Sequence, residues 1–254
     1  MLIFVKDLGK LKFISGFNAP KRDTRAGGLM MDYEQMIKFL KRTPTGNLTD
    51  AMRRLEISGY TKGIYCLQGK TDENMVGPAL TVQYIPKQPG QSRGLPGQFA
   101  IARMCTNGQV MVVAARDTKC WLTGGNVARV AELSGAAGIV VDGCIRDREE
   151  ISSHSMPFFC KGSGTKPYAE ELQLAAINVP IGIDGCRVCP GDIVVGDLDG
   201  IVVLPADRLE EIIYQAEEIE EIEEQLAEAV ERKASLEELN AIGNRKPVVR
   251  KKGN

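Results

Sequence analysis

Residues 124–150 read Gly-Gly-Asn-Val-Ala-Arg-Val-Ala-Glu-Leu-Ser-Gly-Ala-Ala-Gly-Ile-Val-Val-Asp-Gly-Cys-Ile-Arg-Asp-Arg-Glu-Glu. This stretch predicts a glycine turn, a helix over residues 127–134, a buried strand over residues 138–142 and then a charged segment. Similar helical and strand-like runs alternate along the middle of the chain, and β segments gather late. The pattern predicts a three-layer α/β domain.

The glycine turn is a candidate binding site for an anion. Gly124 and Gly125 precede Asn126 and Val127, which begin the helical run. The first amides of a helix lack internal partners, and the helix dipole favours negative charge there. These four residues are therefore candidates to hold a substrate carboxylate. The alternative is that the two glycines only permit a tight turn.

The charged segment after the strand offers two kinds of ligand-binding group. Arg146 follows the strand at the sheet edge where α/β proteins usually bind ligands, and its guanidinium can hold a carboxylate through two hydrogen bonds. Asp147 and Glu150 are three residues apart, so they share a face if a helix begins here. Their oxygens suit Mg²⁺ or Mn²⁺. The alternative is an ordinary capped helix start, with Asp147 as the cap or a first-turn acid and the other charges solvated.

The spacing of these residues resembles a family signature. Gly125, Arg146, Asp147 and Glu150 match Gly-x20-Arg-Asp-x2-Glu, the pattern of the RraA-like class II pyruvate aldolases. These enzymes cleave 4-hydroxy-4-methyl-2-oxoglutarate and related acids. The resemblance extends roughly over residues 46–205 and includes Gly-Pro-Ala-Leu-Thr-Val at 77–82 and Pro-Gly-Asp-Ile-Val-Val-Gly-Asp at 190–197.

The resemblance implies a swivelling β/β/α fold and a lyase that depends on a divalent metal. The acid matching Asp147 would bind Mg²⁺ or Mn²⁺ directly, and the one matching Glu150 would act through coordinated water. Arg146 and the glycine-turn amides would hold the 2-oxo acid, whose C3–C4 bond breaks to leave a pyruvate enolate. Arg146 and Asp147 are thus the expected catalytic residues. Decarboxylation of oxaloacetate passes through the same enolate and is expected alongside.

The family comparison also raises two expectations about what surrounds the site. Some members carry an acid in the glycine turn that handles protons through water, but Gly125 and Asn126 cannot do this. The proton donor must therefore differ, or decarboxylation must prevail over aldol cleavage. Family members form homotrimers or homohexamers with sites near subunit contacts, so we expect a homo-oligomer here.

A non-catalytic alternative comes from the same superfamily, whose regulators bind and inhibit ribonuclease E-type enzymes. Those regulators lack the last acid of the motif, so Glu150 favours the enzyme. The acidic C-terminal segment keeps the regulator hypothesis open. A methyltransferase is rejected, because no glycine-rich nucleotide loop follows an early strand with an acid at the next strand end.

Composition restricts the remaining classes of partner and location. The chain has 254 residues, a net charge of −1 and no apolar run long enough to span a membrane, so neither nucleic acid nor a membrane is an expected partner. Seven scattered cysteines and an N-terminus unlike a signal peptide predict a cytoplasmic protein. The Cys-x-x-Cys pair Cys186/Cys189 is interpreted as structural, and His154 as a surface residue.

The chain divides into three expected parts. Residues 1–31 are an N-terminal extension, residues 32–205 the RraA-like catalytic domain, and residues 206–254 an acidic helix with a basic tail. The pattern predicts one helix from Ala206 to about Ala241, followed by a disordered tail from Asn244. Earlier helices are expected over residues 33–41 and 49–55, the second with Thr49 as its cap. Strands are expected over residues 78–84, 110–114, 139–142, 157–160, 180–183, 193–196 and 201–204.

Overall fold

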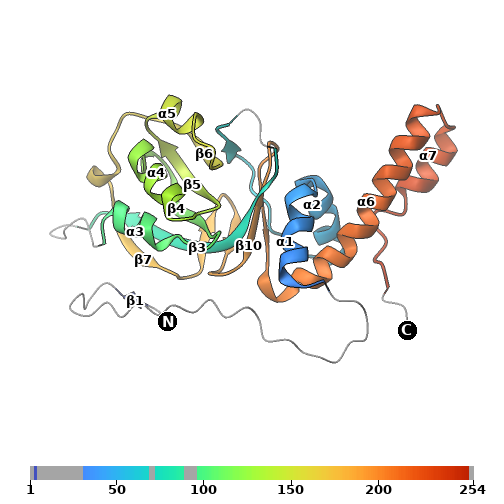
Figure 1. Ribbon diagram of the computed structural model, residues 1–254, viewed down its shortest axis with the longest axis horizontal. Helices are drawn as coiled ribbons and strands as arrows, with labels where there is room; N and C mark the ends of the chain where they lie inside the picture. Colours follow the sequence, from blue (N-terminus) through green and yellow to red (C-terminus); the bar gives the residue numbers. More distant parts are fainter. Residues whose placement is uncertain (1–2, 5–30, 69–71, 89–95, 252–254) are drawn as a thin grey trace.

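The structure is a computed structural model that describes residues 3–4, 31–68, 72–88 and 96–251. Figure 1 shows a body built around a strongly twisted sheet, two helices beside it and a helical arm that projects beyond them. The candidate site lies in the body, and the arm leads away from it.

Within the described residues, the body is built on a nine-stranded sheet with four parallel strands in its middle. These are β3 (Met75–Pro86), β4 (Val110–Trp121), β5 (Gly138–Ile145) and β6 (Phe158–Ser163). The short β2 (Tyr65–Cys66) pairs antiparallel with β6. On the other side, β7 (Leu172–Ile177) pairs antiparallel with β3, and β1 (Ile3–Phe4) pairs with β7.

The sheet nearly closes because β3 pairs with β10 as well as with β4 and β7. Its first residues pair with β10 (Ile193–Gly196), which also forms a hairpin with β11 (Ile201–Leu204). A separate hairpin joins β8 (Ile181–Ile183) to β9 (Cys186–Val188). Together these strands enclose a core that includes Val112, Val140 and Phe159. The β layers of the fold thus pack face to face.

Helices cover the opposite face of the parallel strands. They are α3 (Gln98–Met104), α4 (Gly125–Leu133) and α5 (Arg148–Ser152). Along β5, Ile139 and Val141 belong to the core beneath these helices, whereas Val140 belongs to the core on the other side. A strand that is buried on both faces has a continuous apolar sequence, and residues 138–141 show this pattern. The structure confirms the predicted three-layer swivelling β/β/α fold.

The two helices before the sheet pack on the β10–β11 hairpin together with the start of α6 (Leu209–Glu231). α1 (Tyr33–Arg42) begins at Asp32, which forms a capping box with Gln35. α2 (Thr45–Arg54) begins four residues before the predicted start at Thr49. Its cap comes from a distant turn: Asp197 accepts hydrogen bonds from the Thr45 N–H and hydroxyl, each at 2.8 Å. The prediction of Thr49 as the cap was therefore wrong, because tertiary structure supplies the capping carboxylate.

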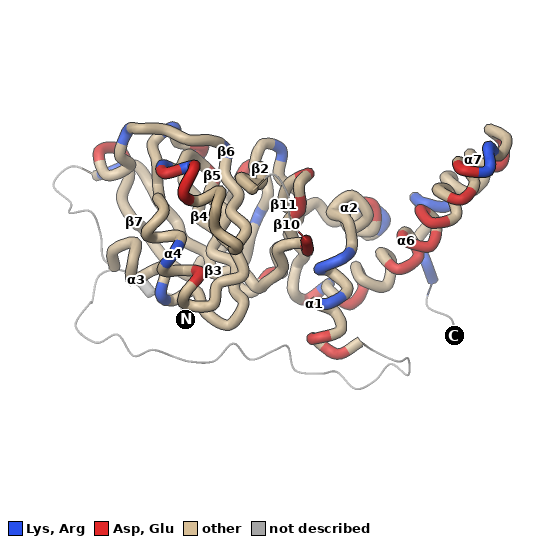
Figure 2. Tube along the Cα trace, turned by 45° about the horizontal axis from the view of Figure 1, so that its top comes forward, with Lys and Arg blue, Asp and Glu red and all other residues tan. Residues whose placement is uncertain are grey.

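The predicted single C-terminal helix is divided into two. The chain makes a 3₁₀ turn over Ala206–Arg208, continues as α6 to Glu231 and resumes as α7 (Leu236–Gly243). Lys233 adopts a positive φ of 57° between them, and Ser235 caps α7 by accepting from the Glu238 N–H. Residues that favour a turn thus interrupt the periodic pattern. Figure 2 shows acidic residues along both helices of this arm.

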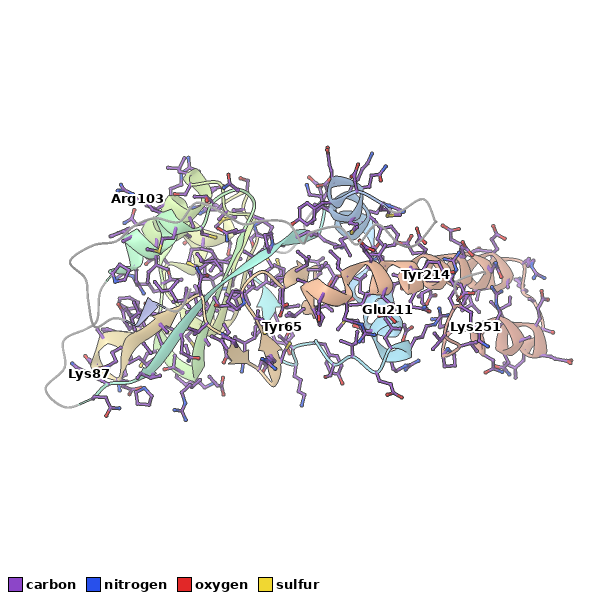
Figure 3. The ribbon with its side chains drawn as sticks, turned by 90° about the horizontal axis from the view of Figure 1, so that it is seen from below. Tyr65, Lys87, Arg103, Glu211, Tyr214 and Lys251 are labelled. Atoms are coloured by element: carbon purple, nitrogen blue, oxygen red, sulfur yellow. The ribbon has the colours of Figure 1, made fainter. Side chains whose placement is uncertain are left out.

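The described part of the basic tail is ordered against the arm, so the prediction of a disordered end was wrong for residues 244–251. The buried guanidinium of Arg54 donates to the carbonyls of Lys246 at 2.6 Å and Arg245 at 3.1 Å, and it pairs with Glu218 at 2.8 Å. Farther along, the Tyr214 hydroxyl donates to the Lys251 carbonyl at 3.1 Å, and Figure 3 shows these two residues side by side. Opposite charges and Arg54 hold the tail in place. Residues 252–254 lie outside the described residues.

Several other elements depart from the sequence patterns. The strand β7, the helix α3 and the short strands β2 and β9 are not predicted by the patterns, and β4 extends well beyond residue 114. The predicted N-terminal extension lies almost entirely outside the described residues; its described parts are Met31 and the strand β1. None of the helices formed by the described residues is both long and apolar enough to cross a membrane.

A charge cluster that is buried except for Asp117 joins the two β layers near the carboxyl ends of the parallel strands. Lys161 on β6 lies 2.9 Å from Asp142, 2.8 Å from Asp184 and 3.3 Å from Asp117. Burial opposes the charge of Lys161, but hydrogen bonds and the carboxylates' field outweigh it and raise the pKa of the ammonium group.

Replacing Lys161 with methionine should lower the free energy of unfolding by about 3 kcal/mol, because the buried Asp142 carboxylate would lose its counter-charge. Urea denaturation at pH 7 measures this change. Lys119→Met is the matched control, since Lys119 is 81% exposed and pairs with Asp117 at 3.6 Å. If both variants unfold at the same urea concentration, the cluster does not stabilise the fold.

The same cluster predicts a loss of stability in acid. Burial alone would raise the pKa of Asp184, but hydrogen bonds from Lys161 and from the Lys62 and Gly63 N–H groups hold that pKa below its usual value. A lowered pKa in the folded state stabilises the protein above the unfolded value of about 4 and stops doing so as pH falls through the folded pKa. Asp184→Asn should therefore flatten the decrease in unfolding free energy below about pH 4. Urea titrations between pH 7 and pH 3 measure it; an unchanged decrease would contradict the assignment.

Candidate functional site

The candidate site lies where β5 ends and α5 begins. Asp147 stands at the N-cap position of α5 with φ 58° and ψ 41°, the left-handed region that few residues other than glycine adopt. Its side chain makes no capping hydrogen bond to that helix. Instead, Asp147 Oδ2 accepts from the Gly125 N–H at 3.1 Å. Asp147 thus occupies the cap position that the alternative predicted, but its carboxylate is turned toward the glycine turn instead of capping the helix.

Gly124 and Gly125 form a floor beneath two carboxylates. A Cβ atom at Gly124 would lie 2.4 Å from Asp147 Oδ2, and one at Gly125 would lie 2.1 Å from Glu150 Cδ. Neither position can therefore carry a side chain without displacing an acid. The close packing explains both glycines and brings together residues that are more than twenty positions apart in the chain.

Arg146 completes the cluster from the end of β5. Its Nε lies 3.3 Å from Asp147 Oδ2, and its guanidinium stacks on the Trp121 ring at 4.4 Å from the centroid. The backbone N–H of Arg146 donates to the Thr123 carbonyl at 3.0 Å, which ties the arginine to the segment before the glycine turn. Half of the Arg146 side chain remains exposed to solvent, so its outer N–H groups can reach a ligand.

The structure brings together Gly124, Gly125, Arg146, Asp147 and Glu150, but it gives the first amides of α4 different roles from those expected. The Gly125 N–H is used by Asp147, and the Val127 N–H donates to the Gly124 carbonyl at 3.1 Å. The Val127 side chain packs in the core beneath the helices. Asn126 is exposed, and its N–H has no partner within the helix. The Asn126 amide is thus the best placed of these groups to meet a ligand.

Two residues of the site escaped the sequence patterns. Trp121 and Thr123 precede the glycine turn and contact Arg146. Neither residue belongs to a sequence motif, so the sequence patterns offered no reason to single them out. Other candidates lie elsewhere. His154 is not a surface residue as expected: its side chain is 11% exposed, with Nδ1 3.9 Å from Glu132 on α4. Cys186 is buried and Cys189 half-buried, and both are free thiols.

The carboxylates of Asp147 and Glu150 fit a divalent metal of the hard type. Asp147 packs on Gly124 and Glu150 packs on the adjacent Gly125. Both acids are exposed, and their oxygens are the ligands that Mg²⁺ and Mn²⁺ prefer. In the described part of the chain, no three His, Cys, Asp or Glu residues converge on one point. Two carboxylates alone make an open site, which suits a metal that keeps several waters and shares ligands with its substrate.

Gly125→Ala should displace the Glu150 side chain while the fold is retained. The three atoms nearest to the new Cβ all belong to the flexible end of Glu150, so the melting temperature should change little. Mn²⁺ binding, measured by electron paramagnetic resonance, should weaken about ten-fold if Glu150 helps to hold the ion. The double variant Gly125→Ala/Glu150→Ala should bind no more weakly than Glu150→Ala alone, because both changes act on one group. Additive losses would contradict this coupling.

The fold and the cluster define a class of protein: a three-layer swivelling α/β protein with an open carboxylate site beneath a glycine turn. The family model described as RraA-like, Aldolase/RraA, matches residues 45–203. The chain belongs to the RraA-like family. The match covers every residue of the cluster but leaves out the C-terminal arm.

Individual relatives agree with the family assignment. The chain is 33% identical over 174 residues to a protein of Halalkalibacterium halodurans named "Putative 4-hydroxy-4-methyl-2-oxoglutarate aldolase", covering 68% of this chain and 78% of that one. It is 25% identical to protein DlpA of Legionella pneumophila over 82% of this chain, but it spans only 34% of the length of DlpA.

A solved structure shows the same fold. RraAS2 of Streptomyces coelicolor, described as an unusual member of the RNase ES inhibitor RraA protein family, superposes with a TM-score of 0.67 and 30% sequence identity. The likeness covers 77% of this chain and 96% of that one.

Proposed function

We propose that this protein is a divalent-metal-dependent carbon–carbon lyase that cleaves 4-hydroxy-2-oxo acids or decarboxylates oxaloacetate through a pyruvate enolate. One observation carries the proposal: the Asp147 and Glu150 carboxylates pack on Gly124 and Gly125 with the Arg146 guanidinium beside them. The aldolase name of the Halalkalibacterium halodurans relative supports the reaction class.

In this proposal some residues of the cluster bind the metal and the substrate, and Arg146 also stabilises negative charge. Asp147, and Glu150 through water, would hold the metal, which when bound supplies Lewis-acid stabilisation of charge on the 2-oxo oxygen. Arg146 and the Asn126 N–H would bind the carboxylate of the 2-oxo acid. Because Arg146 Nε lies 3.3 Å from Asp147 Oδ2, its charge would also stabilise negative charge that grows on the 2-oxo oxygen of a bound acid. The Trp121 ring holds the guanidinium in position.

The glycine turn supplies no proton donor of its own. Gly125 lacks a side chain, and the Asn126 amide does not titrate. Decarboxylation of oxaloacetate needs no base to remove a hydroxyl proton, so this step asks less of the site than aldol cleavage does. We therefore propose that oxaloacetate decarboxylation is at least as fast as cleavage of 4-hydroxy-4-methyl-2-oxoglutarate.

Pyruvate release from purified protein tests the proposal. Oxaloacetate and 4-hydroxy-4-methyl-2-oxoglutarate are each supplied with Mg²⁺, with Mn²⁺ or with EDTA. Pyruvate formation that exceeds the protein-free metal background and stops in EDTA is the expected result, and the ratio of the two rates reports on the absent proton donor. Pyruvate at the background rate from both compounds would reject the lyase.

The second candidate is a regulator that binds a protein partner such as a ribonuclease. The likeness to RraAS2 supports it, and so does the arm of α6 and α7, which lies outside the residues of the family match. Inhibition of a purified ribonuclease E-type enzyme by a variant that releases no pyruvate would favour the regulator. For the lyase we also propose a homotrimer or homohexamer with the site near subunit contacts, which light scattering of the purified protein tests.

A further inference from the structure

The segment of residues 164–168, between β6 and β7, holds the backbone and the ring of Trp121. The backbone N–H of Trp121 donates to the Lys166 carbonyl at 2.9 Å. At the other end of the residue, the indole Nε1–H donates to the Thr165 carbonyl at 3.1 Å. The segment therefore restrains the ring on which the Arg146 guanidinium stacks.

The same segment also contacts the strand that carries Arg146. The Gly164 N–H donates at 2.9 Å to the carbonyl of Ile145, the residue directly before Arg146. A Cβ atom at Gly164 would lie 2.8 Å from the Lys119 carbonyl oxygen, so the segment passes too close to β4 for a side chain at this position. The segment thus packs closely on the ends of both strands that lead into the candidate site.

Tyr168, at the end of this segment, connects Trp121 to the core of the protein. The Tyr168 and Trp121 rings meet edge to face, with their centroids 6.0 Å apart and their planes at 76°. On its other side Tyr168 meets Tyr84 in the same way, at 5.4 Å and 78°. Both geometries are favourable for aromatic pairs. Tyr84 is 3% exposed and belongs to the core beneath the helices, so the row of rings begins at a fixed point.

The stack of Arg146 on Trp121 needs such support. The Trp121 ring is half-buried and half of the Arg146 side chain is exposed, and a cation is attracted only weakly to an aromatic ring at an exposed site. A ring that could turn freely would not hold the guanidinium in one orientation, because ordering both side chains costs conformational entropy. A charge that is already oriented stabilises a transition state best, since it does not have to reorganise during the reaction.

We propose that Tyr168 is a positioning residue for the reaction: it holds the Trp121 ring in place, and through that ring it orients Arg146 toward the bound 2-oxo acid. The inference rests on the proposed function, because the orientation of Arg146 affects pyruvate release only if the acid binds there. Tyr168 needs no contact with the substrate for this role.

Substitutions of Tyr168 test the inference through steady-state rates with oxaloacetate. Tyr168→Leu removes the ring and should lower kcat about five-fold while KM changes by less than about two-fold, because the lost orientation matters most in the transition state. Tyr168→Phe keeps the ring and should retain most of kcat. The control Tyr65→Leu makes the same exchange at a tyrosine that is 56% exposed on β2, and it should leave both constants unchanged. Melting curves confirm that each variant is folded at the assay temperature.

Two further measurements separate a positioning role from a merely structural one. Trp121 is the single tryptophan of the chain, so its fluorescence reports on this ring alone. Acrylamide should quench that fluorescence faster in Tyr168→Leu but not in Tyr168→Phe. In a protein that already carries Arg146→Lys, Tyr168→Leu should lower kcat by less than about two-fold, because an ammonium group does not stack as a planar guanidinium does.

The results distinguish failure of this inference from failure of the proposed function. An unchanged kcat or unchanged quenching in Tyr168→Leu overturns the positioning role alone. So does an equal loss of kcat with arginine and with lysine at position 146, because Tyr168 would then act independently of Arg146. Pyruvate release by the unsubstituted protein at the protein-free metal background rejects the proposed function, and the positioning role with it.

Discussion

Asp147→Asn is expected to lower metal-dependent pyruvate release by about a thousand-fold or more while the protein stays folded. Asparagine keeps the size of aspartate and tolerates the left-handed conformation seen at φ 58°. It removes the negative charge that we propose as the direct metal ligand, and metal stabilisation of the transition state contributes several kcal/mol, or about tenfold in rate for each 1.4 kcal/mol. Initial rates with saturating Mg²⁺, together with a melting curve, measure the effect.

Asparagine is a sharper test than alanine, because alanine at a left-handed position costs stability of its own. Glu149→Gln is the matched control: it removes a charge from an exposed neighbour in the first turn of α5. This control should retain nearly full activity. Metal-stimulated turnover by Asp147→Asn within ten-fold of the parent protein would remove Asp147 from the metal site.

Arg146→Ala should lower kcat by about a hundred- to a thousand-fold, since a group that stabilises developing charge contributes about 3 kcal/mol. The guanidinium is held between the Trp121 ring and Asp147 Oδ2, the acid that we propose as the metal ligand, so its positive charge would stabilise the growing negative charge of an enolate bound there. Arg146→Lys should recover only part of the rate, because an ammonium group keeps the charge but loses the planar stacking and the paired hydrogen bonds. Steady-state rates with oxaloacetate measure both variants.

Arg148→Ala supplies the control for Arg146, because Arg148 is an exposed arginine two residues farther along the chain. It should leave kcat unchanged. If Arg146→Ala raises the KM for oxaloacetate but leaves kcat intact, Arg146 binds substrate and transition state equally and is not a catalytic residue.

Much of the site was predictable because its residues belong to local patterns. The glycine turn, the helix after it and the strand of residues 138–142 follow from periodicity and backbone preference within about thirty residues. Because the spacing of Gly125, Arg146, Asp147 and Glu150 resembles a family signature, the four could then be predicted as one cluster. Spacing could not predict which group each backbone amide of the turn binds. The Gly125 N–H donates to the Asp147 carboxylate, and this bond depends on how α4 and α5 pack on the sheet.

The difference between local patterns and distant contacts also explains why the predictions for the C-terminal tail, the start of α2 and the strand β7 failed. The helical pattern of residues 209–231 predicts a helix, but the order of the tail depends on Arg54, which is 192 residues distant from its acceptor Lys246. The start of α2 depends on Asp197 in a turn 152 residues away. The strand β7 has only a weak pattern of its own and is stabilised by pairing with β3. Such contacts carry no local signal.

By itself, the sequence determined the α/β class, the central part of each parallel strand and the charges available to the site, because burial periodicity and residue chemistry act over short stretches of chain. Only the tertiary structure decided which carboxylate meets which amide and that Trp121 supports Arg146. These features arise where segments distant in sequence pack together, and packing is decided by the whole chain rather than by any one segment.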